Sequence, residues 1–361
     1  MSRLHQLQQI FSYGLTGNRP ISPPNLIYHI TTRCNMACRH CSDDVWGNPD
    51  QDLSLDEIER FAASLGQIDS LALGGGEPFM RKDLADICKL FVIHSQVRTI
   101  TIPSNGFTPE LICSTVTRIL DECPEIVLGI ALSLDGFQET HDKIRMPGSF
   151  DKVMQTGRML KPLCIDYPRL SLTFNATIST VNQKELPELA RYIRQQFQSE
   201  LQFNIISGNP RDPSVTLPSR SELQQTIDGI YAARELSAIT AGFLNSYRDA
   251  VLNTIFDKGK QGVPCKAGSL LCLVDANGDV RSCPMLAPLG NLKENSFHTI
   301  WNSPEALRQH QSIKQGACRC TNDCFTGMSL LYYWKLPLTI FWHALKFRVG
   351  TAFGRKPVHT S

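Results

Sequence analysis

Apolar residues along the chain alternate between short runs and longer segments in which they recur every three or four positions. Six short runs predict buried strands at residues 25–31, 70–73, 98–103, 126–134, 169–178 and 201–206. The segments between them predict amphipathic helices, the first of which begins at a Ser54–Glu57 capping box. Strands that alternate with helices imply parallel pairing through right-handed crossovers. We therefore expect an α/β fold, a partial (β/α)6 TIM barrel.

The pattern changes after the sixth strand. A proline-containing linker leads to two helical stretches that end near residue 256, and the runs 271–275 and 279–283 then flank an Asn277-Gly278 turn, which predicts a β-hairpin. We expect five parts: an N-terminal extension (1–24), the barrel (25–210), a helical connector (211–260), a small β-hairpin/helical domain (261–327) and a C-terminal tail (328–361).

Composition is that of an ordinary globular protein, with 42% hydrophobic and 19% charged residues in 361. The net charge of +2 gives no case for a nucleic-acid partner. Residues 1–24 contain no apolar run of the kind found in secretion signals. These features predict a cytoplasmic protein, where thiols stay reduced.

The loop after the first strand contains three cysteines, Cys34, Cys38 and Cys41, spaced C-x3-C-x2-C. Three thiolates in one short loop can hold three irons of a [4Fe–4S] cube and leave the fourth iron open to another ligand. On spacing alone, a zinc site that recruits His40, or thiols without a metal, are the alternatives.

Three further motifs also follow predicted strands. They are Gly75-Gly76-Glu77 after the second strand, Ser104-Asn105 after the third, and Ser133 and Asp135 with Arg145 after the fourth. Glycine lets a backbone approach a ligand closely, and the carboxyl ends of barrel strands are where chemistry is found. Ordinary turns and capped strand ends explain the same residues, and Asn105-Gly106 is a turn signal in its own right.

Cys34, Cys38 and Cys41 together resemble the signature of the radical S-adenosylmethionine (SAM) enzymes, although the family has an aromatic residue where this chain has His40. The resemblance implies that the open iron chelates SAM and that reductive cleavage yields a 5′-deoxyadenosyl radical. It also implies an external reductant such as flavodoxin or ferredoxin. The residues implied to bind SAM are Gly75, Gly76, Glu77, Ser104, Asn105, Ser133, Asp135 and Arg145.

A second group of cysteines follows residue 264. The spacings Cys265-x12-Gly278-x4-Cys283 and Cys320-x3-Cys324 resemble the opening and close of the SPASM or twitch domain. A block of cysteines found in the full SPASM domain is missing, so one auxiliary [4Fe–4S] cluster is expected. The implied ligands are Cys265, Cys283 and Cys324, with Cys272 or Cys320 as the fourth and Cys318 as a spare. Structural zinc is the alternative, and Cys88, Cys113, Cys123 and Cys164 are expected in the core.

The resemblance implies an enzyme that abstracts hydrogen from its substrate, and peptide or protein maturation is the first hypothesis. Modification of a small molecule, glycan or lipid-linked compound is the second, and a non-catalytic iron–sulfur or zinc protein is the third. From Cys324 onward the chain has no Asp or Glu but is rich in aromatic and basic residues. This pattern favours a segment on an anionic membrane surface, so the protein would be peripheral on the inner face of the membrane. A C-terminal helix packed on the barrel is the alternative.

Overall fold

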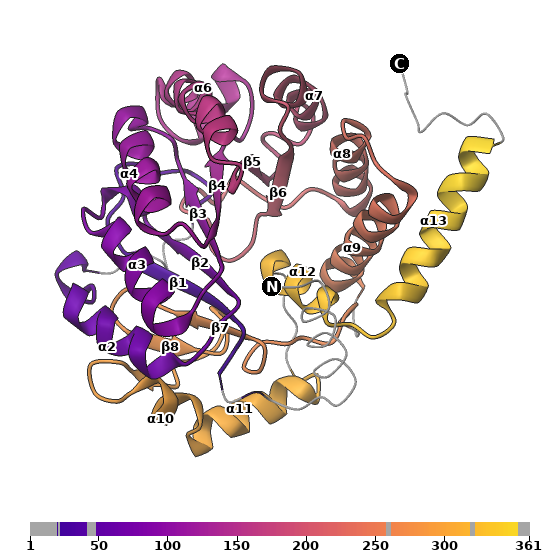
Figure 1. Cartoon of the computed structure of the whole chain (residues 1–361). Coiled ribbons are helices and arrows are strands. Elements are labelled where there is room, and N and C mark those ends of the chain that lie inside the picture. Colours follow the sequence, from indigo (N-terminus) through magenta and orange to yellow (C-terminus); the bar gives the residue numbers. More distant parts are fainter. Residues whose placement is uncertain (1–19, 21, 42–47, 258–260, 318–321, 353–361) are drawn as a thin grey trace.

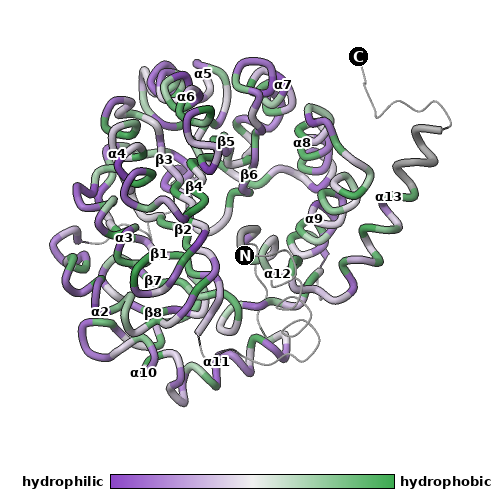
Figure 2. Tube along the Cα trace, viewed as in Figure 1, coloured by the Kyte–Doolittle hydropathy of each residue, from purple (hydrophilic) through white to green (hydrophobic). Residues whose placement is uncertain are grey.

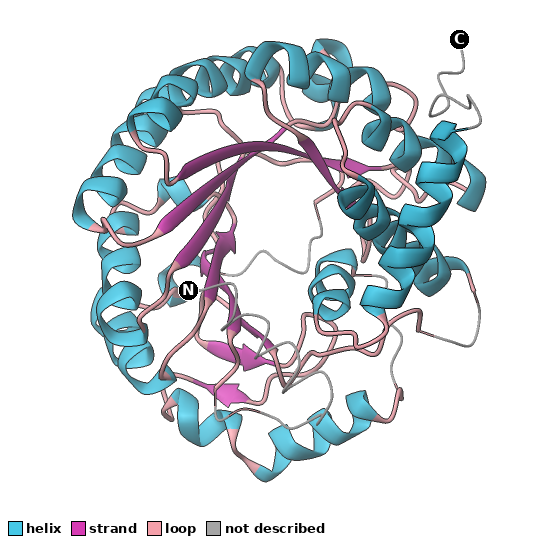
Figure 3. Cartoon of the chain, turned by 45° about the vertical axis from the view of Figure 1, so that its right-hand side comes forward, coloured by secondary structure: helices cyan, strands magenta, loops and turns pink. Residues whose placement is uncertain are grey.

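The computed structural model describes residue 20 and residues 22–41, 48–257, 261–317 and 322–352. Six parallel strands curve around a central space, with helices on their outer side (Figures 1 and 3). The strands are β1 (Asn25–Thr31), β2 (Ser70–Gly75), β3 (Thr99–Ser104), β4 (Val127–Ser133), β5 (Leu170–Ile178) and β6 (Leu201–Ile205). All six lie within two residues of the predicted ranges, and the predicted α/β class is confirmed.

The outer helices bury their apolar faces against the strands, and their outer turns are mostly hydrophilic (Figure 2). In the first of them, Ser54 and Glu57 form the predicted capping box, and Phe61 packs edge-on against the buried ring of Tyr28 on β1. The helices are α2 (Leu55–Leu65), α3 (Leu84–Ser95), α4 (Pro109–Glu122), α5 (Gln138–Ile144), α6 (Ser149–Asp166) and α7 (Leu186–Phe197), with short 3-10 turns η2 (Pro49–Gln51) and η3 (Pro78–Met80).

The other face of the strands, turned away from these helices, carries small and polar residues. The register aligns Ala72, Thr101 and Gly129 across three neighbouring strands on this face. Thr101, Ser171 and Gln202 are exposed there. In a closed TIM barrel, bulky side chains fill this interior. Here the inner wall is open and offers hydroxyl and amide groups.

The predicted hairpin is confirmed, and it continues the barrel sheet. β7 (Leu271–Val274) pairs in parallel with β1, while β8 (Asp279–Arg281) and β9 (Gly290–Asn291) follow in antiparallel order. The nine-stranded sheet has the order β6-β5-β4-β3-β2-β1-β7-β8-β9. The region with the later cysteines therefore lies directly beside the strand that leads to the first cysteine loop.

The remaining helices cover the C-terminal half. They are α8 (Arg220–Ala232), α9 (Ala238–Phe256), α10 (Phe297–Trp301), α11 (Pro304–Lys314), α12 (Asp323–Leu331) and α13 (Leu336–Ala352). α13 packs against α9, where Ser246 Oγ lies 3.1 Å from Thr339 Oγ1 and His343 Nε2 lies 3.3 Å from Asp249 Oδ2. None of the described helices combines the length and the apolar character needed to cross a bilayer.

Candidate active site

The first cysteine loop is anchored on both sides. Before it, Thr31 Oγ1 donates to the Asp52 carboxylate over 2.7 Å at the end of β1. Within it, the Cys41 N–H donates to the Cys38 carbonyl over 3.1 Å, which turns the chain back on itself. The Arg39 side chain donates to Asp212 over 2.8 Å. The three thiols are thus held on one short, ordered stretch at the carboxyl end of β1.

Burial, together with the nearby charges of Glu77, Cys38 and Cys41, raises the pKa of the Cys34 thiol to about 11. Burial also raises the pKa of Cys38, while Arg145, whose Nη1 lies 3.8 Å from Cys38 Sγ, opposes that rise. The positive charge of Arg145 favours the thiolate form of Cys38. Three cysteine side chains on one short loop are the donor set that a [4Fe–4S] cube takes, with the fourth iron left open.

Two glycines bring the loop after β2 against the cysteine loop. A Cβ on Gly75, whose φ is +128°, would stand 2.3 Å from the Thr31 carbonyl oxygen. A Cβ on Gly76 would stand 2.1 Å from the Arg33 carbonyl oxygen. The N–H groups of Gly76 and Glu77 donate to the same two carbonyls, over 2.8 and 2.7 Å. Only glycine allows this backbone approach.

Glu77 is fully buried and ties three loops together. Its Oε1 accepts from Ser104 Oγ over 2.9 Å and from the Phe79 N–H over 3.2 Å, and its Oε2 accepts from the Asn105 N–H over 2.7 Å. The Asn105 amide in turn donates to Asn35 Oδ1, inside the cysteine loop, over 2.7 Å. Burial raises the pKa of Glu77 to about 7 against these hydrogen bonds. The motifs after β2 and β3 thus meet the cysteine loop.

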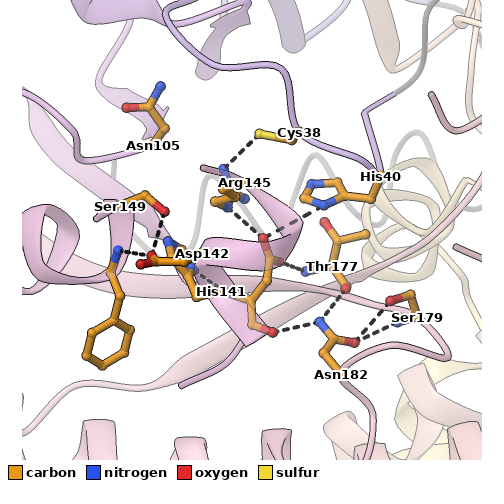
Figure 4. A network of polar contacts seen from close by, with 12 residues as sticks. Cys38, His40, Asn105, His141, Asp142, Arg145, Ser149, Thr177, Ser179 and Asn182 are labelled. Carbon is orange, nitrogen blue, oxygen red and sulfur yellow. Dashed lines mark hydrogen bonds and ion pairs between the residues drawn. The ribbon is translucent and has the colours of Figure 1, made fainter. Parts of the chain in front are cut away.

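The motif after β4 also reaches the cysteine loop, where Arg145 points toward Cys38 (Figure 4). Asp135 and Arg145 form a buried ion pair, with Arg145 Nε 2.6 Å from Asp135 Oδ2, and Asp135 Oδ1 accepts from the Thr177 N–H over 2.7 Å. Burial alone would raise the pKa of Asp135, but Arg145, His40 and other neighbours lower it to about 2. The carboxylate therefore stays charged and holds the guanidinium beside the Cys38 sulfur.

Two residues that were not among the predicted SAM-binding residues complete this network. His40 Nδ1 lies 3.9 Å from Asp135 Oδ2, and burial lowers the pKa of His40. Asn182 donates to the Asp135 carbonyl over 2.8 Å and to the Thr177 carbonyl over 2.9 Å. The position of His40 in the signature could have pointed to its role, but no local pattern marks Asn182. Ser133 is half-buried at the end of β4 and makes no side-chain hydrogen bond to the described part of the chain.

The later cysteines divide between the two faces of the hairpin. Cys265 and Cys283 gather with Leu271 in an apolar cluster on the inner side of β7. Cys272 lies on the opposite face, in the core beneath the outer helices, where its Sγ donates to the Arg281 carbonyl over 3.4 Å. Cys324 belongs to α12, but its side chain is outside the described set, and Cys318 and Cys320 lie outside the described residues.

Comparison with known proteins agrees with this geometry. The model of the radical SAM superfamily matches residues 28–193, and that of the SPASM iron–sulfur cluster-binding domain matches residues 265–325. Mycofactocin maturase MftC of Mycolicibacterium smegmatis is 24% identical over 347 residues, covering 86% of this chain and 81% of that protein.

The chain also resembles a second curated protein and a solved structure. Pre-heme d1 synthase of Dinoroseobacter shibae is 29% identical over 340 residues, covering 84% of this chain and 80% of that protein. The solved structure of native anSMEcpe with bound AdoMet and the Cp18Cys peptide has the same fold, with a TM-score of 0.57 at 15% identity over 92% of this chain and 99% of that one.

The two family matches cover the two regions that contain the cysteine loop and the later cysteines. The cysteine loop has the donor set that a [4Fe–4S] cube needs. The chain is an enzyme that belongs to the radical SAM superfamily, uses a [4Fe–4S] cluster and SAM, and carries a SPASM-type iron–sulfur domain.

Proposed function

We propose that this enzyme matures a peptide or protein by abstracting hydrogen from an unactivated C–H bond. The similarity to a mycofactocin maturase, which extends over 86% of the chain, carries the proposal. The bound cluster and SAM supply a reductive cleavage that gives access to such bonds, while the protein orients the reactants and excludes water. Flavodoxin or ferredoxin is the proposed source of the electron.

At the cluster we assign Cys34, Cys38 and Cys41 as ligands. The residues proposed to bind SAM are Gly75, Gly76, Glu77, Ser104, Asn105, Ser133, Asp135 and Arg145, and the loop contacts described above support this assignment. Arg145 has a defined part in this proposal. Its charge stabilises the Cys38 thiolate, and Asp135 keeps it there.

For the auxiliary site we propose one [4Fe–4S] cluster that binds substrate or accepts an electron. Cys265 and Cys283, which share an apolar cluster on the inner face of the hairpin, are the first two ligands. Cys320 and Cys324 are the proposed others, on the sequence pattern. Cys272 points to the opposite face, so we favour Cys320 over Cys272 as the fourth ligand.

The inner wall of the barrel favours a peptide. Its positions on β2 to β6 carry no ionisable residue. Thr101, Thr173, Asn175 and Gln202 of that wall make no side-chain hydrogen bonds within the described part of the chain, so their hydroxyls and amides are available to a ligand. A neutral segment with many donors and acceptors, such as a peptide main chain, fits this wall.

The second candidate is a small-molecule substrate, and the similarity to pre-heme d1 synthase favours a tetrapyrrole. A tetrapyrrole with several carboxylates would be expected to meet Arg or Lys side chains where it binds. The inner positions of β2 to β6 offer none, and for that reason we place this candidate second.

Anaerobic reconstitution followed by dithionite and SAM tests both candidates. Product 5′-deoxyadenosine is measured by chromatography with added peptides encoded beside the gene, or with iron coproporphyrin III. We expect about eight irons per chain for two cubes, and 5′-deoxyadenosine formation that increases with peptide together with a mass change of that peptide. Stimulation by the porphyrin alone would move the proposal to the second candidate, and a loaded protein that never cleaves SAM would refute both.

We also propose that the protein is cytoplasmic and contacts the inner face of the membrane through residues 328–361. The absence of acidic residues in that segment supports this location. The surface that would make the contact is derived next.

A further inference from the structure

The described surface exposes fourteen large hydrophobic residues, and six of them lie within fifteen positions of one another near the C-terminus. They are Leu331, Trp334, Leu338, Phe341, Trp342 and Leu345. Phe341 and Trp342 are each 60% exposed, and Leu338 is 57% exposed. Single exposed apolar residues are normal on protein surfaces, but a contiguous group of this size marks a contact surface.

Four of these residues form one face of α13, and we call Leu338, Phe341, Trp342 and Leu345 the α13 strip. Their spacing of three, four and seven positions places them on a single side of an α-helix. The opposite side of the helix is packed. The Ile340 carbonyl comes so close to Gly242 of α9 that a Cβ there would stand 2.6 Å from its oxygen. Contacts with α9 therefore hold the helix in place and leave the strip facing outward.

The charge around the α13 strip identifies its partner. Residues 325–361 contain no Asp or Glu and five basic residues, which are Lys335, Lys346, Arg348, Arg355 and Lys356. Lys335 Nζ lies 5.0 Å from the centre of the exposed Trp334 ring, so an aromatic ring and a cation stand together at the start of the helix. Aromatic residues beside cations are typical of helices that lie in the surface of an anionic bilayer. A second copy of this chain would bring a second cationic segment against the first.

We propose that the α13 strip inserts into the surface of an anionic lipid bilayer, with the helix lying in the plane of the membrane. This inference specifies the membrane contact proposed above and rests on it. It is independent of the substrate. α9, which is packed on the other side of α13, would join the barrel to the anchored helix.

Sedimentation of the reconstituted full-length enzyme with vesicles tests the inference. We expect binding to phosphatidylglycerol vesicles in 0.1 M NaCl, little binding to phosphatidylcholine vesicles, and loss of binding in 1 M NaCl. The triple variant Leu338→Ser, Phe341→Ser, Trp342→Ser should bind at least ten-fold more weakly. Lys335→Gln should weaken binding roughly five-fold, the share of one basic residue at an anionic surface. Ile165→Ser, at a 78% exposed apolar residue on α6, is the matched control and should bind like the unmodified enzyme.

Equal binding to both kinds of vesicle, or a triple variant that binds like the control, would overturn the inference. A third result would also overturn it: the unmodified enzyme forms a dimer in sedimentation velocity, the triple variant does not, and neither protein sediments with vesicles. The strip would then serve self-association. SAM cleavage measured without vesicles should be the same in the triple variant and the control. Failure of membrane binding is thereby separated from failure of the proposed enzyme activity.

Discussion

The two groups of cysteines are built in different ways. Cys34, Cys38 and Cys41 share one loop of eight residues, and hydrogen bonds connect this loop and the residues just before it to the loops after β2 and β3. Cys272 and Cys283 lie on a hairpin and Cys265 just before it, and the register that pairs Leu273 with Arg281 sets Cys283 opposite Leu271. Cys272 is then left on the other face of the sheet.

The difference follows from backbone geometry. In a loop the chain can turn each thiol toward a common centre, so spacing alone is informative. In a strand successive side chains point to opposite faces, so two cysteines can be near in space and still unable to share a ligand. The comparison teaches that a cysteine on a strand has to be assigned by register as well as by spacing.

The largest effect is expected in the loop. The variant Cys34→Ala, Cys38→Ala, Cys41→Ala should lose SAM cleavage entirely and about half of its iron, because one cube of four irons loses all its protein ligands. Iron and sulfide analysis with chromatography of 5′-deoxyadenosine measures both. A variant that still cleaves SAM would show that the loop is not the cluster site.

A smaller but clear effect is expected at the hairpin. Cys283→Ser should lose the auxiliary iron, about four atoms per chain, and keep SAM cleavage, because the loop is untouched. The measurement is iron content together with 5′-deoxyadenosine formed in the absence of substrate. If Cys283→Ser kept all its iron, the auxiliary site would not include the inner face of the hairpin.

Much of the fold could be predicted from the sequence. The runs that became β1 to β6 are apolar because one face packs on helices, and the capping box at Ser54 marks the start of α2. Pairing of β7 with β1 was not predictable, because residues 32–270 separate the two strands and no local pattern shows which edge of a sheet a hairpin joins. The short helix α5 was also missed, because its 7 residues are too few to show the apolar repeat of a helix.

The contacts around the cysteine loop could be predicted in part. The sequence singled out Gly75 and Gly76, because a close backbone approach restricts the residue type, and the structure shows that approach. Their part in binding SAM, and that of Glu77, stays a prediction. Asn182 was not found, because it reaches the site through the carbonyls of Asp135 and Thr177, and Asp135 lies 47 positions away in the sequence. Such a long-range contact to a backbone group leaves no local sequence pattern. The sequence also did not show which face of the sheet Cys272 occupies, because that depends on the register between β7 and β8.

A further prediction concerns the buried ion pair of Asp135 and Arg145, which lies beside Cys38 of the first cysteine group. Asp135→Asn removes the charge that balances Arg145 and should destabilise the enzyme by about 3–5 kcal/mol. The pKa of Asp135 falls from its ordinary 3.8 to about 2 on folding. Its contribution is therefore complete at pH 7 and is lost as the pH falls through about 2.

Anaerobic urea unfolding at pH 7 measures the loss of stability in Asp135→Asn. The auxiliary iron should be retained, since the hairpin does not use this pair. Asp212→Asn is the matched control, because its ion pair with Arg39 also anchors the loop but is only half-buried, and it should cost less than about 1 kcal/mol. Equal losses in the two variants would show that burial of the pair has no special importance.

The smallest effect is expected at Cys272, and it tests directly whether the face of the strand decides the role of a cysteine. Cys272→Ala should keep all its iron and lose only about 1 kcal/mol of stability, because the thiol is packed in the core as a small apolar group. Cys88→Ala is the matched control, since Cys88 is equally buried on α3 and lies in the same core. Iron analysis and thermal unfolding should give the same result for both variants. A loss of about four irons in Cys272→Ala alone would mean that the hairpin changes its register when the cluster binds, because no side chain on the outer face could otherwise reach the thiols on the inner one.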